Sequence, residues 1–232
     1  MRVILPKTIN RKMFLKRLLV AVFILSSAAS FSQDSDLGNW WIYFGNKKLG
    51  KKFNLHHEVQ YRNYNAIGDL EQLLLRAGVG YNLTENNNNL LLGYGFIISQ
   101  NYNAAGDKDQ VNEHRIYQQY ITKQNFGRFY LSHRYRLEER WVEGNFRMRF
   151  RYFLAAKLAL NKPKLEKNTL YLSGYNELFI NQEEGNYFDR NRIYGGLGFM
   201  LNKNLKFELG YMNQIFGNGS RDQVNVIMSA TF

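Results

Sequence analysis

The sequence predicts an all-β fold, a single antiparallel transmembrane β-barrel of about 10–12 strands. The first observation is that apolar and polar residues alternate along nearly the whole chain, as in strands, where successive side chains point to opposite faces. The second is length, because the alternating segments reach the roughly 9–11 residues that cross a bilayer, whereas soluble strands usually run about five or six. The third is a composition with 17 Phe, 16 Tyr and only 2 Pro, which favours strands over helices.

The clearest alternating segment is residues 144–160. One of its faces is almost purely apolar, and the other carries Arg147, Arg149 and Arg151. The segment before it, residues 128–141, repeats this design. Such a strand matches a wall with one face in lipid and one face in a polar interior.

The N-terminal residues 1–32 are predicted to be a cleaved signal peptide. A basic stretch without acids precedes the apolar run 18–25, and small residues follow, with Ser30 and Ser32 at positions −3 and −1 of the cut. The apolar run is too short to span a bilayer as a helix, which needs about 20 residues, so cleavage is favoured over a membrane anchor. Residues 33–232 then form one outer-membrane barrel domain, because no linker or break in composition divides them.

The net charge of +12 overstates how basic the barrel is. Residues 1–33 hold six basic residues and no acid, so the remainder carries only +6. The sequence contains no basic helix, glycine-rich phosphate loop or zinc-finger spacing, and we therefore expect no nucleic-acid partner and no cofactor. Cysteine is absent, which excludes disulfides, thiolate metal sites and a cysteine nucleophile.

Ten long strands are predicted after a short aromatic segment at 40–44, which adds a further strand or lies against the barrel. They are expected at residues 53–64, 70–83, 90–102, 113–122, 128–141, 144–160, 170–180, 192–199, 205–215 and 224–232. Polar loops and turns separate them, for example TENNNN at 84–89 and the longer segments 103–112 and 181–189. The pattern at 113–122 is the weakest, because the second face is only half apolar.

The polar face is expected to line the lumen and the apolar face to meet lipid, although a soluble barrel would reverse this arrangement. The strands are too long for an ordinary soluble barrel, and only helices and closed barrels satisfy every backbone amide in lipid. The chain also ends on an aromatic residue, Phe232, of the kind that outer-membrane barrels present to their assembly machinery. The charged residues predicted to line the lumen are Glu58, Arg62, Arg76, Arg134, Arg136, Glu138, Arg147, Arg149, Arg151, Glu177, Arg192 and Glu208.

Short motifs occur along nearly the whole chain after the leader. The most specific are YNELFIN (175–181), FDRNRIYGGLGF (188–199) and ELGYM (208–212). EVQYR, RAGVGYNL, EHRIYQQ and RYRLEER add weaker matches nearer the N-terminus. Together they resemble the domain-of-unknown-function family 2490, a family of outer-membrane barrels of Bacteroidota and other Gram-negative bacteria. The resemblance implies an outer-membrane barrel and carries no assigned reaction.

The charged rows allow two interpretations of the lumen. In one, a basic excess guides small anionic solutes through a narrow, porin-like pore. In the other, each charge is paired and the network fills and braces the barrel, and this interpretation is favoured because unpaired buried charge is costly. The expected partners are outer-membrane lipids and the barrel-assembly machinery, and we expect a monomer.

Two further hypotheses stay open. An outer-membrane lipid-modifying hydrolase would rely on His56 or His133. However, Ser132 is adjacent to His133 and points to the opposite face of a regular strand, so the two form no dyad, and no enzyme activity is predicted. A secreted soluble ligand-binding barrel would place the arginine face of residues 147–151 outside, in water.

Overall fold

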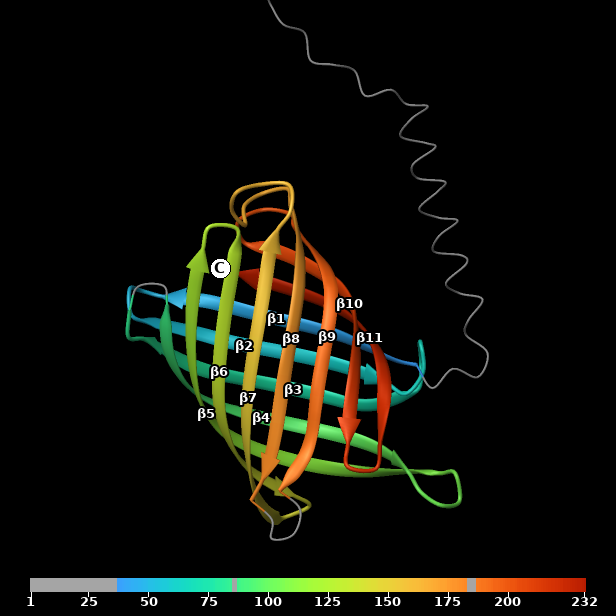
Figure 1. The fold of residues 1–232 in the computed structure, drawn as a ribbon. Helices are drawn as coiled ribbons and strands as arrows, with labels where there is room; N and C mark the ends of the chain where they lie inside the picture. Colours follow the sequence, from blue (N-terminus) through green and yellow to red (C-terminus); the bar gives the residue numbers. More distant parts are fainter. Residues whose placement is uncertain (1–36, 85–86, 183–186) are drawn as a thin grey trace, which may run out of the picture. The chain divides into compact units, whose positions relative to one another are not determined.

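The computed structural model describes residues 37–84, 87–182 and 187–232, which form one closed β-barrel (Figure 1). The predicted signal peptide, residues 1–32, lies outside the described residues. The wall consists of β1 (Gly38–Leu49), β2 (Phe53–Asn63), β3 (Leu70–Asn82), β4 (Asn88–Tyr102), β5 (Lys108–Phe126), β6 (Phe129–Val142), β7 (Asn145–Ala159), β8 (Thr169–Asn181), β9 (Phe188–Met200), β10 (Leu205–Phe216) and β11 (Gly219–Thr231). The predicted all-β closed barrel is confirmed, and these eleven strands fall within the predicted range.

The barrel closes through a parallel pair between β1 and β11. All other neighbours are consecutive in the chain and pair antiparallel. In the seam, Trp40 lies opposite Asn225 and Phe44 lies opposite Ser229. This seam departs from the purely antiparallel barrel expected from the sequence. It follows from the odd strand number, since strands that alternate in direction leave the first and the last pointing the same way. The aromatic segment 40–44 is therefore part of a full wall strand.

β5 is the longest strand, with 19 residues, although its sequence pattern was the weakest. The predicted loop at 103–112 was too long, because the β4–β5 pairing continues from the barrel wall out to Tyr102 and Lys108. Figure 1 shows this hairpin extending past its neighbours. The alternation weakens where a hairpin leaves the wall, because neither face there has to be apolar. Asp189 was also predicted in a loop and instead lies in β9.

Successive antiparallel strands place every second connection at the same end of the barrel. The connections after β1, β3, β5, β7 and β9 share one end with the C-terminus, and we call it the C-terminal end. The connections after the even-numbered strands lie at the opposite end. The final residue is held in place, since the Phe232 amide donates a hydrogen bond to the Asn46 carbonyl at 2.9 Å.

The barrel is polar inside and apolar outside. Ten of the twelve charged residues predicted to line the lumen are at most 7% exposed. On the other register, Val79, Leu92, Leu197 and Leu209 each expose more than half of their surface. A soluble barrel would bury the second set and expose the first. Within residues 37–84, 87–182 and 187–232, no helix is long and apolar enough to cross a membrane.

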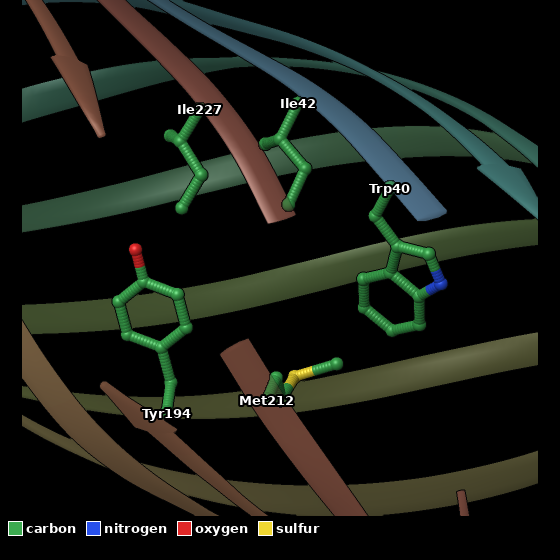
Figure 2. Close-up of a cluster of buried hydrophobic side chains, with 5 residues drawn as sticks. All are labelled: Trp40, Ile42, Tyr194, Met212 and Ile227. Atoms are coloured by element: carbon green, nitrogen blue, oxygen red, sulfur yellow. The ribbon is translucent and has the colours of Figure 1, made fainter. Parts of the chain in front are cut away.

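One apolar cluster interrupts the polar interior beside the seam. It comes from β1, β9, β10 and β11 and comprises Trp40, Ile42, Tyr194, Met212 and Ile227 (Figure 2). All five side chains are at most 7% exposed. The cluster adds apolar packing to the mainly polar interior, and it adds side-chain contacts to the parallel seam.

Candidate functional site

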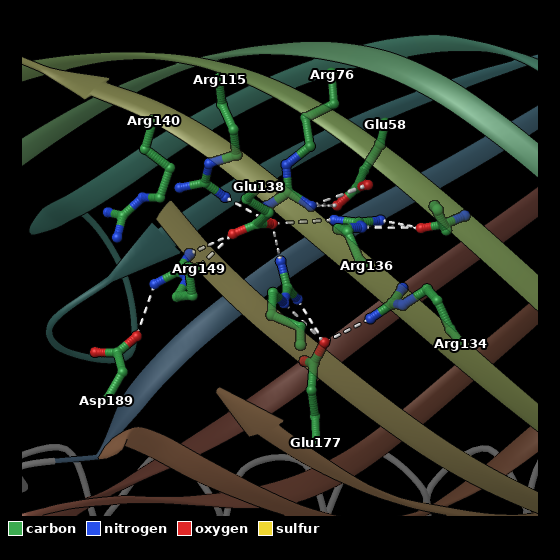
Figure 3. Close-up of polar contacts among 12 residues, drawn as sticks. Glu58, Arg76, Arg115, Arg134, Arg136, Glu138, Arg140, Arg149, Glu177 and Asp189 are labelled. Carbon is green, nitrogen blue, oxygen red and sulfur yellow. Dashed lines mark hydrogen bonds and ion pairs between the residues drawn. The ribbon is translucent and has the colours of Figure 1, made fainter. Parts of the chain in front are cut away.

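The charged interior is centred on Glu138 of β6, which has no exposed surface. Four guanidinium groups surround its carboxylate, and Figure 3 labels Arg115, Arg136 and Arg149 around it. The closest nitrogen–oxygen distances are 2.6 Å to Arg151, 2.8 Å to Arg149, 3.3 Å to Arg115 and 3.5 Å to Arg136. These arginines come from β5, β6 and β7, so one carboxylate joins three neighbouring strands.

Glu177 of β8 forms a second centre, nearer the C-terminal end than Glu138. Its carboxylate lies 2.5 Å from Arg151, 2.6 Å from Arg134 and 3.6 Å from Arg192. Arg151 therefore bridges the two glutamates, because its Nη1 contacts Glu138 and its Nη2 contacts Glu177. We call the connected set the arginine–glutamate network, which consists of Arg115, Arg134, Arg136, Arg149, Arg151, Arg192, Glu138 and Glu177.

Further ion pairs extend the network toward the opposite end. Glu113 lies 2.6 Å from Arg115 and 2.8 Å from Arg140, and Asp189 lies 2.7 Å from Arg149. The lumen residues predicted from the sequence did not include Glu113, Arg115, Arg140 and Asp189. The alternation of β5 places Glu113 and Arg115 on one face of the strand, and this pattern alone would have predicted both in the lumen.

Aromatic rings and side-chain amides also hold some of the arginines. The Arg62 guanidinium lies 3.7 Å from the Trp40 ring centroid, and its Nη1 donates to Gln72 at 2.7 Å. Arg136 lies 4.4 Å from the Tyr117 ring centroid and donates through Nε to Gln119 at 2.9 Å. Stacking and neutral acceptors stabilise cations without neutralising them, so the interior keeps a positive excess.

The half of the lumen nearer the opposite end is filled. Each of the eleven strands contributes at least one inward side chain that is at most 6% exposed. These are Trp40, Arg62, Leu74, Ile97, Tyr117, Glu138, Arg149, Phe179, Arg192, Met212 and Gln223. Because an inward side chain from every strand has almost no accessible surface, we infer that this half of the described lumen is filled rather than open to water.

The half nearer the C-terminal end is hollow. A cavity of about 680 Å³ reaches from the strand ends down to the arginine–glutamate network. Lys123, Lys157 and Lys206 line it near its mouth. Glu208 accepts a hydrogen bond from Lys157 and another from the Tyr171 hydroxyl at 3.0 Å. The lumen is thus a cup, closed at one end and open at the other.

Most of the charged residues predicted to line the lumen lie in the cup or its floor. Glu58 pairs with Arg76 at 3.0 Å. Arg134 is only half-buried, with 18% of its side chain exposed, yet it still contacts Glu177. Arg147 departs from the prediction, because it is exposed beside the β6–β7 turn. Arg147 is an inward-facing position of β7 close to the turn, and at this end of the strand the position lies in solvent rather than in the lumen.

The two candidate histidines lie on opposite faces of the barrel wall. His56 lines the cavity, 3.5 Å from Glu58. His133 lies on the outer face, where its ring forms a hydrogen bond with the Tyr152 hydroxyl at 2.9 Å. Ser132 lines the cavity, so the two adjacent residues point to opposite faces, as predicted. Across the described ranges, no group of three or more His, Cys, Asp or Glu side chains could hold a metal ion.

Comparison with known proteins identifies relatives without a described activity. Residues 37–225 match the model of a family described as a protein of unknown function, DUF2490. An uncharacterised protein of Methylorubrum extorquens is 30% identical over 164 residues, which cover 68% of this chain and 69% of that protein. The matched residues span β1 to β10 completely and reach into β11, so the family model covers nearly the whole barrel.

Proposed function

This chain belongs to the DUF2490 family, as its sequence motifs predicted, and we propose that it is an integral outer-membrane barrel whose lumen is closed by the arginine–glutamate network. The observation that carries the proposal is the inverted wall, with buried charge inside and exposed apolar side chains outside. Exposing so many large apolar residues to water would be strongly unfavourable, whereas lipid accommodates them.

Aromatic side chains near both strand ends support the same placement. At the C-terminal end, Phe232 stacks on His57, whose ring also bonds to the Tyr43 hydroxyl at 3.0 Å. At the opposite end, Trp141 packs against Phe146 with ring centroids 5.4 Å apart. Aromatic residues at both ends of the strands are typical of the two interfaces of a bilayer.

The filled layer favours a wall component over an open channel. Ions crossing it would have to separate the pairs around Glu138, which lie in a dry and crowded interior. A narrow, anion-leaning pore is the second candidate, and the positive excess of the lumen favours it. That function requires a second arrangement of the network, in which the side chains move toward the wall.

The membrane placement can be tested with single cysteines, since the chain has none. A fluorophore on Leu209→Cys, which lies mid-strand on the outer face, is expected to be quenched by nitroxides attached to lipid acyl chains. The matched control is Lys123→Cys, which faces the cavity, and its fluorophore is expected to escape lipid quenching.

The soluble-barrel hypothesis predicts the contrary outcome. The protein would then remain in the soluble fraction when mixed with liposomes, and lipid nitroxides would quench neither label. That result would exclude an integral membrane placement, whatever role the lumen has.

A further inference from the structure

The cup at the C-terminal end has the size and depth of a ligand site. Its volume of about 680 Å³ lies within the range of small-molecule pockets, roughly 300–1,000 Å³. Its mouth is accessible, because Lys123 and Thr231 line it and are exposed. Its floor is the arginine–glutamate network. A molecule can therefore enter from one side only.

The lining of the cup is strongly basic. Six arginines and three lysines face it, against only Glu58, Glu177 and Glu208. The uncompensated charges lie in a confined space with low-dielectric walls, where their potentials add and are screened less than on a surface. An anion in the cup would lower this self-repulsion, whereas a cation would increase it.

Two of the three lysines at the mouth lack a carboxylate partner. Lys123, Lys157 and Lys206 come from β5, β7 and β10 and lie within three residues of their strand ends. Only Lys157 pairs with a carboxylate, that of Glu208; within the described residues, Lys123 and Lys206 have no carboxylate within 4.0 Å. An incoming carboxylate or phosphate would supply the partner that these two ammonium groups lack.

Apolar side chains line part of the wall between the lysines and the arginine floor, beside polar ones such as Asn54, Ser132 and Ser173. Ile42 and Ile227 lie on the seam side, and Ile121, Leu91 and Phe153 come from the strands across the lumen. These apolar side chains would not stabilise a fully hydrated inorganic anion. They form a belt that suits the apolar body of a molecule whose charged group stays at the mouth.

We propose that the cup binds one organic anion, with a carboxylate or phosphate group held by Lys123, Lys157 and Lys206 and a short apolar body along the belt. This proposal goes beyond membrane placement. It depends on the cavity alone and stands whether or not the barrel conducts ions.

The test is calorimetric titration of the barrel refolded in phosphatidylcholine nanodiscs, with empty nanodiscs subtracted. The probes are octyl phosphate, octanoate, inorganic phosphate and octanol. We expect saturable binding of octyl phosphate or octanoate at one molecule per barrel, and the comparison of these two tells which head group the lysines prefer. Inorganic phosphate and octanol should each bind at least about tenfold more weakly, because each lacks one half of the interaction.

Two variants locate the binding. The triple change of Lys123, Lys157 and Lys206 to Gln is expected to raise the Kd by about tenfold or more. The matched control changes Lys164, Lys167 and Lys203 to Gln, because these lysines are exposed at the same end, outside the cup. The control removes the same charge and should leave the Kd unchanged.

Ala155→Trp keeps every charge but fills the apolar belt, and it should abolish binding of both octyl probes. It also provides a test if the triple variant does not fold, which heat-modifiable gel mobility would reveal. The proposal is overturned if neither octyl probe binds the folded barrel above the empty nanodiscs. It is also overturned if inorganic phosphate binds as tightly as octyl phosphate, or if the two triple variants weaken binding equally.

Discussion

Glu138 shows how a single residue organises this lumen. Its carboxylate has no exposed surface and contacts four arginines. These contacts stabilise only the charged form of the side chain. Burying a charge costs several kcal/mol, and the cost is recovered only when its partners are close and well oriented. Removing the one carboxylate leaves Arg115, Arg136, Arg149 and Arg151 facing one another.

Replacing Glu138 with Gln should therefore destabilise the barrel strongly. We expect a loss of about 3–5 kcal/mol in the free energy of unfolding, the usual effect of breaking a buried ion pair from one side. The measurement is urea unfolding of the refolded barrel in lipid vesicles, followed by tryptophan fluorescence.

The control is Glu166→Gln, which removes an exposed carboxylate that pairs with Lys162 at 3.0 Å in the β7–β8 turn. Exposed pairs contribute about 0–1 kcal/mol, so this change should be nearly silent. Equal effects of the two substitutions would contradict the central place assigned to Glu138.

At the scale of the strand, alternation alone predicted most of the wall. The three arginines of residues 147–151 identified β7, because only a strand places every second residue on one face. The same reasoning failed at the β4–β5 hairpin, where the strands leave the wall and the two faces become equivalent. It also left the 40–44 segment undecided, since the pairing of a terminal strand depends on how the barrel closes.

The register of the β1–β11 seam can be tested by disulfide cross-linking. Phe44 and Ser229 are register partners and both line the cavity, so cysteines at these positions should form a disulfide on oxidation. The chain contains no other cysteine to compete. The readout is the loss of free thiols with an unchanged monomer mass, measured by mass spectrometry.

Phe44→Cys with Thr231→Cys is the matched pair for this experiment. It also faces inward but is offset by two residues, because Thr231 pairs with Asn46. We expect little cross-linking there, since the Cα atoms of a disulfide lie within about 7 Å. Efficient cross-linking of the offset pair instead would mean that the seam has another register.

At the scale of the whole molecule, the sequence predicted which side chains face inward but not how they meet. Glu138 and Arg149 are direct cross-strand partners, yet Arg134 and Glu177 come from strands separated by β7. Such contacts depend on strand number, tilt and barrel radius, which alternation does not contain. For the same reason, the excess of basic residues was predictable, whereas the division of the lumen into a filled half and a cup was not.

The closed lumen is the central claim, and conductance across a planar bilayer tests it most directly. The barrel, refolded and shown to be folded by its heat-modifiable gel mobility, should insert without steady current steps, because side chains fill the layer around Glu138. Stable, ohmic steps from the folded protein, with anions carrying the current, would contradict the closed lumen and establish the pore instead.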